Sequence, residues 1–165
     1  MKIKMIILLL LMFILCGCGY TTRVYNLPGH LKSVYIETFK NYTDEPNIEN
    51  DLRTKIIAAF QNDGNLNIAT NEEADAVLKG SLVGYSRHGL RYDSNQGVQE
   101  YRLVISVNFE FIDKSTNTVI IDAVNFSGDT SFYLTGSQAL SEKTARSQAL
   151  DDLSHRILNK IITLW

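Results

Sequence analysis

The sequence contains few cysteines and prolines and shows no strong excess of charge of either sign. Only two of its 165 residues are cysteine, Cys16 and Cys18, and only Pro28 and Pro46 are proline. No low-complexity tract or internal repeat occurs, which argues against a linker-rich or repetitive chain. The formal net charge of −2 argues against nucleic acid as the main partner, because proteins that bind nucleic acid carry clustered positive charge.

Sequence patterns that carry catalytic or metal chemistry are also missing. His30, His88 and His155 are far apart in the chain and do not have the spacing of metal ligands. There is no G-x-S-x-G nucleophile elbow, and the glycines of residues 80–84 lack the following lysine of a phosphate-binding loop. We therefore expect a protein that is not an enzyme and that binds neither a metal nor a diffusible cofactor.

The longest apolar run, residues 6–15, is preceded by Lys2 and Lys4. At about 1.5 Å per residue the run spans roughly 15 Å, half of a ~30 Å hydrocarbon core, so it is too short for a typical membrane-spanning helix. Positive charge, an apolar run and then a small residue before Cys18 are the order of a secretory signal peptide. We therefore expect residues 1–17 to be a signal peptide.

Leu15, Gly17 and Cys18 resemble the bacterial lipobox, in which the cysteine receives a diacylglyceryl thioether and, after cleavage, an N-acyl chain such as palmitate. The resemblance implies a lipoprotein that begins at Cys18, and more than one acyl chain is enough for stable anchoring to a membrane. Cys16 would leave with the signal peptide, so the mature domain is expected to use neither disulfides nor thiolate chemistry. An uncleaved anchor and an unlipidated secreted protein are the two alternatives.

Removal of residues 1–17 would leave 148 residues with 14 basic and 18 acidic side chains. This length suits one domain with a full hydrophobic core. We expect residues 18–30 to be the lipidated N-terminus and a tether, and residues 31–165 to be a single α/β domain.

Hydrophobic periodicity predicts two amphipathic helices. The first follows Pro46 and ends at Gly64, which suits the left-handed position after a helix. The second covers approximately residues 138–163. The apolar stripe of the first helix is Ile48, Leu52, Ile56, Ala59 and Phe60, and that of the second is Ala145, Ala149, Leu153, Ile157 and Ile161, widened by Leu150 and Leu158.

Four strands are predicted, at residues 34–39, 76–87, 101–113 and 118–126. In the third strand one face is apolar and the other is polar. The apolar residues are Leu103, Ile105, Val107, Phe109 and Phe111, and the polar ones are Arg102, Ser106, Asn108 and Glu110. The order β-α-β-β-β-α predicts an α+β two-layer sandwich: a four-stranded mixed β-sheet with both helices on one face. The polar face of the sheet is then left open.

Arg87, His88 and Arg91 form the one basic group that stands out, at the start of a connection expected to run to Glu100. Long connections are often functional, and guanidinium groups suit phosphate recognition. The alternative is a solvated hairpin tip whose charges bind nothing.

The chain resembles the LptE family of lipopolysaccharide-assembly lipoproteins over nearly the whole mature sequence. The likeness lies in Cys18-Gly19-Tyr20, in residues 34–39 (VYIETF) and 41–43 (NYT), in residues 74–80 (ADAVLKG), and in the alanine-rich closing helix. No single motif is highly specific, so the order of the elements carries much of the weight.

The resemblance implies a protein anchored by its lipid in the periplasmic leaflet of the outer membrane of a Gram-negative bacterium. It would plug the LptD β-barrel one-to-one, help that barrel to assemble, and assist the transport of lipopolysaccharide to the cell surface. Arg87, His88 and Arg91 are the residues we expect to contact lipopolysaccharide, from their chemistry and position. A self-assembling secretion-pore or other structural envelope lipoprotein is the main alternative, and a lipid-modifying hydrolase is a more remote one.

Overall fold

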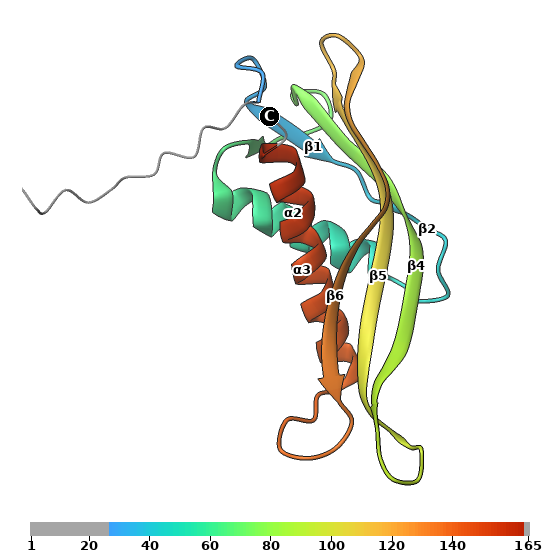
Figure 1. The fold of residues 1–165 in the computed structure, drawn as a ribbon. Coiled ribbons are helices and arrows are strands. Elements are labelled where there is room, and N and C mark those ends of the chain that lie inside the picture. Colours follow the sequence, from blue (N-terminus) through green and yellow to red (C-terminus); the bar gives the residue numbers. More distant parts are fainter. Residues whose placement is uncertain (1–26, 164–165) are drawn as a thin grey trace, which may run out of the picture.

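The computed structural model describes residues 27–163 (Figure 1). The expected signal peptide, Cys18 and residues 18–26 of the expected tether lie outside this range. The helices and strands are, in chain order, β1 (Ser33–Ile36), β2 (Lys40–Asn41), α2 (Ile48–Asp63), β3 (Asn67–Ile68), β4 (Ala76–Tyr92), β5 (Val98–Asp113), β6 (Thr118–Tyr133) and α3 (Glu142–Ile162).

The strands form one mixed sheet in the order β3-β1-β4-β5-β6, with β2 also paired to β4. β1 runs parallel to β3 and β4, whereas β4, β5 and β6 are joined by hairpins and are antiparallel. The α+β class and the mixed sheet are therefore confirmed. The predicted count of four strands is wrong, because β2 and β3 add two more. Each of these has only two residues, too few for periodicity to reveal.

All three long strands extend further than predicted: β4 continues to Tyr92, β5 begins already at Val98, and β6 continues to Tyr133. Gly84 and Gly128 both lie within continuous strands. Gly84 follows an irregularity in the β4–β5 register, and Gly128 lies beneath α3. A Cβ atom at Gly128 would lie 2.5 Å from the backbone nitrogen of Leu153, so the absence of a side chain lets the helix pack directly on β6.

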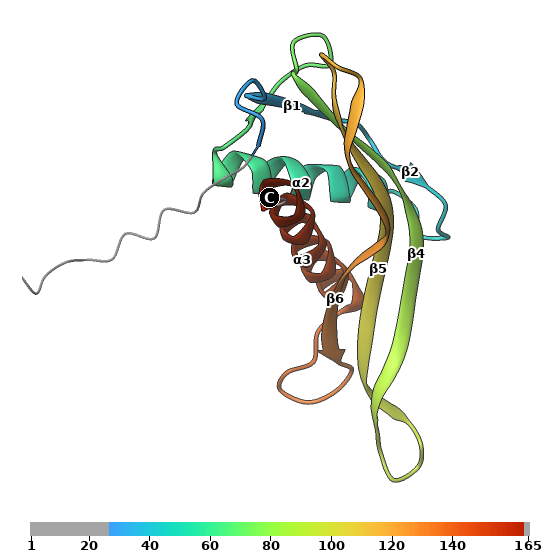
Figure 2. The same cartoon turned by 45° about the horizontal axis from the view of Figure 1, so that its top comes forward.

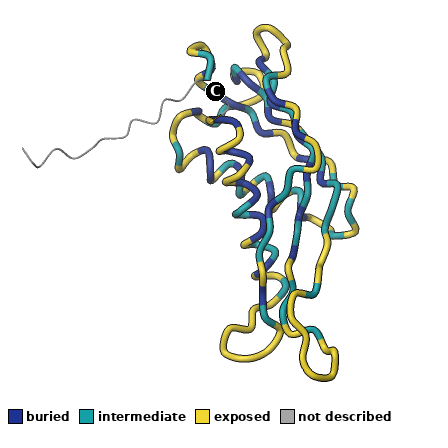
Figure 3. The backbone as a smooth tube through the Cα atoms, viewed as in Figure 1, coloured by how far each residue is buried: buried dark blue, intermediate teal, exposed yellow. Residues whose placement is uncertain are grey.

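Both helices lie on the same side of the sheet, as the two views in Figures 1 and 2 show. The predicted apolar stripes of both helices are buried, and so are the five apolar residues of β5. Figure 3 shows this buried layer between the helices and the sheet. α2 ends as expected at Gly64, where φ is +75° and the N–H donates to the carbonyl of Phe60.

α3 begins at Glu142, four residues later than predicted, because Ser141 is the N-cap and its hydroxyl accepts the Thr144 N–H. The segment before Ser141 forms an exposed connection from β6.

The opposite face of the sheet is open and polar, as predicted. Ser106, Asn108 and Glu110 on β5 are partly exposed on it, and Arg102 is exposed. Irregularities in the register between β4 and β5 and between β5 and β6 bend the sheet near its middle. This bend accompanies a hollow of about 520 Å³ on the open face, lined by residues that include Lys79, Glu110 and Asp122.

Candidate functional site

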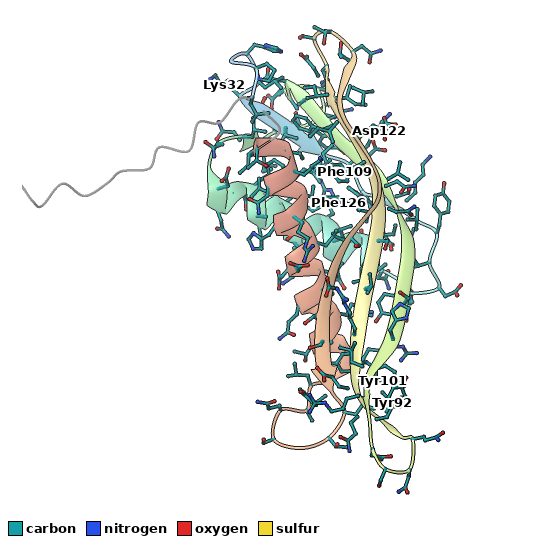
Figure 4. The ribbon with its side chains drawn as sticks, in the orientation of Figure 1. Lys32, Tyr92, Tyr101, Phe109, Asp122 and Phe126 are labelled. Carbon is teal, nitrogen blue, oxygen red and sulfur yellow. The ribbon has the colours of Figure 1, made fainter. Side chains whose placement is uncertain are left out.

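The end of the sheet at the β4–β5 hairpin collects exposed apolar side chains. We call the end of β4 (residues 86–92), the start of β5 (98–102), the end of β6 (129–133) and residues 134–141 the hairpin end. In Figure 1 these segments lie together at the bottom, and in Figure 4 Tyr92 and Tyr101 mark them. Of the seven large hydrophobic side chains that are exposed among residues 27–163, four lie here: Leu90, Tyr92, Leu134 and Leu140. Such a grouping is typical of an interaction site.

The predicted basic group lies at this end, but not in a loop. β4 continues through Arg87, His88 and Arg91 to Tyr92, and the turn to β5 is confined to residues 93–97. The prediction of a long connection up to Glu100 was therefore wrong. Beyond Tyr85 most of β4 is exposed, so the alternation of buried and exposed residues that reveals a strand is lost there.

The three basic residues also do not form one cluster. Arg87 pairs across the ladder with buried Leu103, so its side chain points to the helix-covered face. His88 pairs with Arg102, and Arg91 pairs with Glu100, so these side chains point to the open face. Arg87 thus lies on one face of the sheet, and His88 and Arg91 lie on the other.

On the helix side, Arg87 is held by the first residue of α3. Its Nη1 atom donates to Oε2 of Glu142 over 2.7 Å, and the hydroxyl of Tyr85 donates to Oε1 of the same carboxylate over 3.0 Å. Burial and, after it, the hydrogen bond to Glu142 raise the pKa of the Tyr85 phenol well above its usual range. The two β4 side chains therefore tie the start of α3 to the sheet.

On the open side, Arg91 is held between an aromatic ring and a carboxylate. Its guanidinium carbon lies 5.7 Å from the centre of the Tyr133 ring, and its Nε lies 3.6 Å from a Glu100 oxygen. The Glu100 side chain is only 12% exposed, whereas that of Arg91 is 61% exposed. The charged head of Arg91 is thus oriented by its neighbours while it remains accessible to a ligand.

Arg102 is a further basic residue of this site, which the sequence did not single out. Its Nε donates to Asp129 of β6 over 2.9 Å, and it lies on the open face opposite His88. Knowledge of how β4 pairs with β5 would have revealed it, because that pairing places Arg102 opposite His88. The register of this pairing shifts three times along β4 and could not be counted from the sequence.

The geometry of the hairpin end suits an amphiphile with anionic groups. Exposed apolar side chains and guanidinium groups lie at the same end of the sheet, and guanidinium groups can bind phosphate oxygens through paired hydrogen bonds. Within residues 27–163 no three His, Cys, Asp or Glu side chains gather as metal ligands would. In the same range no helix is both long enough and apolar enough to cross a membrane.

The LptE family model, whose description is lipopolysaccharide-assembly, matches residues 31–164. The chain belongs to this family. The resemblance seen in the sequence is confirmed, and LptE-family membership makes the chain a component of lipopolysaccharide assembly in the Gram-negative envelope. The family consists of assembly components that are not enzymes. No curated protein sequence matches the chain.

Solved structures share the fold of this LptE-family chain at low identity. A lipoprotein B from Nitrosomonas europaea is 15% identical with a TM-score of 0.61, and 88% of this chain and 92% of that one are covered. A PelC dodecamer from Paraburkholderia phytofirmans is 16% identical with a TM-score of 0.55, over 85% and 96%. A minor lipoprotein from Acinetobacter baumannii is 17% identical with a TM-score of 0.54, over 81% and 94%. These likenesses show the fold alone.

Proposed function

We propose that the chain is an outer-membrane lipoprotein that plugs an LptD-type β-barrel, helps that barrel to assemble, and assists the passage of lipopolysaccharide to the cell surface. A lipid on Cys18 holds it in the periplasmic leaflet, with one copy in each barrel.

The open polar face of the sheet is the observation that supports the plug most directly. Both helices cover one face, and the other presents hydroxyl, amide and charged groups such as Ser106, Asn108 and Glu110. The lumen of a large barrel is polar, so this face can lie against the barrel wall without burying apolar surface against polar groups.

Purification of the full chain from detergent-solubilised outer membrane tests this part of the proposal. We expect a large β-barrel protein to be recovered at near-equal stoichiometry. Recovery of the chain without any such barrel would remove the plug from the proposal.

The hairpin end is the proposed contact for lipopolysaccharide. Lipid A carries phosphates and acyl chains, which match the guanidinium groups and the exposed apolar side chains of this end. Arg87, His88 and Arg91 remain part of the proposal, and the structure adds Arg102. Each exposed charge contact is expected to contribute about 0–1 kcal/mol, so single replacements will have small effects.

Binding of lipopolysaccharide to the purified chain tests this contact. Glutamate at positions 87 and 91 would stand beside Glu142 and Glu100, so glutamine is the cleaner replacement. We expect Arg87→Gln/Arg91→Gln to bind clearly more weakly than wild type. The control Lys32→Gln/Lys160→Gln loses the same charge outside the hairpin end and should bind as wild type does. If both double variants bind as wild type does, Arg87 and Arg91 do not contact lipopolysaccharide and are part of a solvated strand end.

A self-assembling envelope lipoprotein is the second candidate, because the PelC relative with the same fold is a dodecamer. Native mass spectrometry separates the two. A ring of identical chains would support the second candidate, and a monomer or a one-to-one complex with a barrel supports the first.

A further inference from the structure

Each of the three arginines of the hairpin end lies beside a carboxylate of another element or of the neighbouring strand. The pairs are Arg87 with Glu142 at 2.7 Å, Arg102 with Asp129 at 2.9 Å, and Arg91 with Glu100 at 3.6 Å. An anionic ligand that binds here must therefore compete with carboxylates that already occupy the guanidinium groups.

The three carboxylates differ in how firmly they are held. Glu100 is largely buried beside Arg91. Asp129 also lies near Arg156, and its backbone N–H donates to Asp152. In the Arg87–Glu142 pair, by contrast, the side chains are 51% and 39% exposed, and Glu142 belongs to a helix rather than to the sheet. Glu142 is therefore the most exposed of the three carboxylates, and its pair with Arg87 is the one that a ligand from solvent can reach most easily.

We propose that Glu142 is an internal competitor, which occupies Arg87 in the free chain and is displaced from it by an anionic group of the ligand. This inference rests on the proposed function, because it concerns the regulation of the same binding site. The carboxylate stands in for a phosphate, so the site is closed to weakly charged molecules and opens to a phosphate that can form two hydrogen bonds.

The surroundings of Glu142 make the exchange feasible. After Arg87 leaves, Glu142 still accepts the hydrogen bond of the Tyr85 hydroxyl. It also lies in the first turn of α3, where the positive end of the helix dipole stabilises a negative charge. An exposed ion pair contributes little in water, so the ligand has only a small interaction to replace.

The test measures binding of lipopolysaccharide to the purified full chain in detergent. Glu142→Gln keeps the shape of the side chain and one oxygen that can accept the Tyr85 hydroxyl, but it removes the charge and replaces the other acceptor oxygen with an amide NH2. We expect this variant to bind about two- to five-fold more tightly than wild type, the range that an exposed pair allows. Asp151→Asn is the matched control, because it removes one negative charge from the pair that Asp151 makes with Lys55 of α2. It should bind as wild type does.

A double variant shows whether the gain acts through Arg87. If Glu142 competes for that guanidinium, Arg87→Gln/Glu142→Gln will bind no more tightly than Arg87→Gln alone. The inference is overturned if Glu142→Gln binds as wild type does or more weakly, if the gain persists without Arg87, or if Asp151→Asn gives the same gain. If neither wild type nor any variant binds lipopolysaccharide, the proposed contact fails and this inference fails with it.

Discussion

The Nε2 atom of His30 lies 2.7 Å from the Oδ2 atom of Asp113, a carboxylate whose side chain is only 6% exposed. The contact joins the chain just before β1 to the last residue of β5. Lys32 and Ser33 follow His30 closely in the chain. Their backbone N–H groups donate to Asp75 over 2.9 and 3.0 Å. Two carboxylates therefore attach the start of β1 to the long strands at the end of the sheet opposite the hairpin end.

These two carboxylates predict a loss of stability in acid. Hydrogen bonds, first from Ser115 and then from His30, hold the pKa of Asp113 below its usual range. The backbone N–H of Lys32 and the hydroxyl of Ser33 lower the pKa of Asp75 in the same direction. The unfolded chain therefore binds more protons than the native state below about pH 4. This contribution to stability is complete above that pH and is lost as the pH falls toward the native pKa values.

The urea midpoint of unfolding, measured between pH 7 and pH 2, checks this prediction. Asp75→Asn/Asp113→Asn should be less stable than wild type at pH 7 and should lose less of its remaining stability in acid. The control Asp44→Asn/Asp63→Asn removes the same number of carboxylates but changes two aspartates that take no part in the contacts with His30, Lys32 and Ser33, and it should follow the wild-type profile. Parallel acid profiles for wild type and the first double variant would contradict the assignment.

Gly128→Ala is predicted to destabilise the fold. The added methyl group would overlap the backbone of Leu153 in α3, and neither the strand nor the helix backbone can move aside easily. Overpacking of this kind costs about 1–3 kcal/mol, which urea unfolding of the purified domain can measure. Gly29→Ala is the control, because nothing lies within 4 Å of the added atom, and its effect should stay within about 0.5 kcal/mol. Equal midpoints for the two variants would show that α3 is not packed this closely on β6.

Tyr85 is predicted to titrate above the usual pH range of a tyrosine phenol. Because burial and Glu142 raise its pKa, the native state retains this proton when the unfolded chain loses it, near pH 10. The contribution of Tyr85 to stability should therefore decline as the pH rises above about 10. In an absorbance titration of tyrosinate, Tyr85→Phe should remove a component that titrates above the usual range of a tyrosine, whereas the control Tyr42→Phe, at an exposed ring, should leave that component in place.

The parts of the fold that the sequence predicted are those with long, regular periodicity. The stripes of α2 and α3 and the alternation along β5 repeat often enough to be unambiguous, and all three are buried as expected. β2 and β3 are held by pairing with neighbours distant in the chain, so their existence depends on tertiary structure. The end of β4 was missed because both of its faces are exposed.

The sequence suggested candidate binding residues but not their arrangement. Arg87 and Arg91 lie near one hairpin, yet the irregular register of β4 places them on opposite faces. The partners Glu142 and Tyr133 come from other elements, and no local pattern links them to β4. Local sequence can suggest which side chains are suited to a ligand, whereas the pairing between elements decides which of them are free to bind it.

The last prediction concerns the anchor. If Cys18 receives the diacylglyceryl group, Cys18→Ala has no thiol for the thioether, and the precursor should stay unlipidated and uncleaved by the lipoprotein signal peptidase. Cys16→Ala is the matched control: it also removes one thiol, but from the segment that leaves with the signal peptide, so it should be labelled as wild type is. Metabolic labelling with palmitate and the shift of the precursor on a gel measure both steps. Wild-type labelling of Cys18→Ala would refute the anchor. Loss of labelling in both variants would show that the thiol of Cys16 is also required.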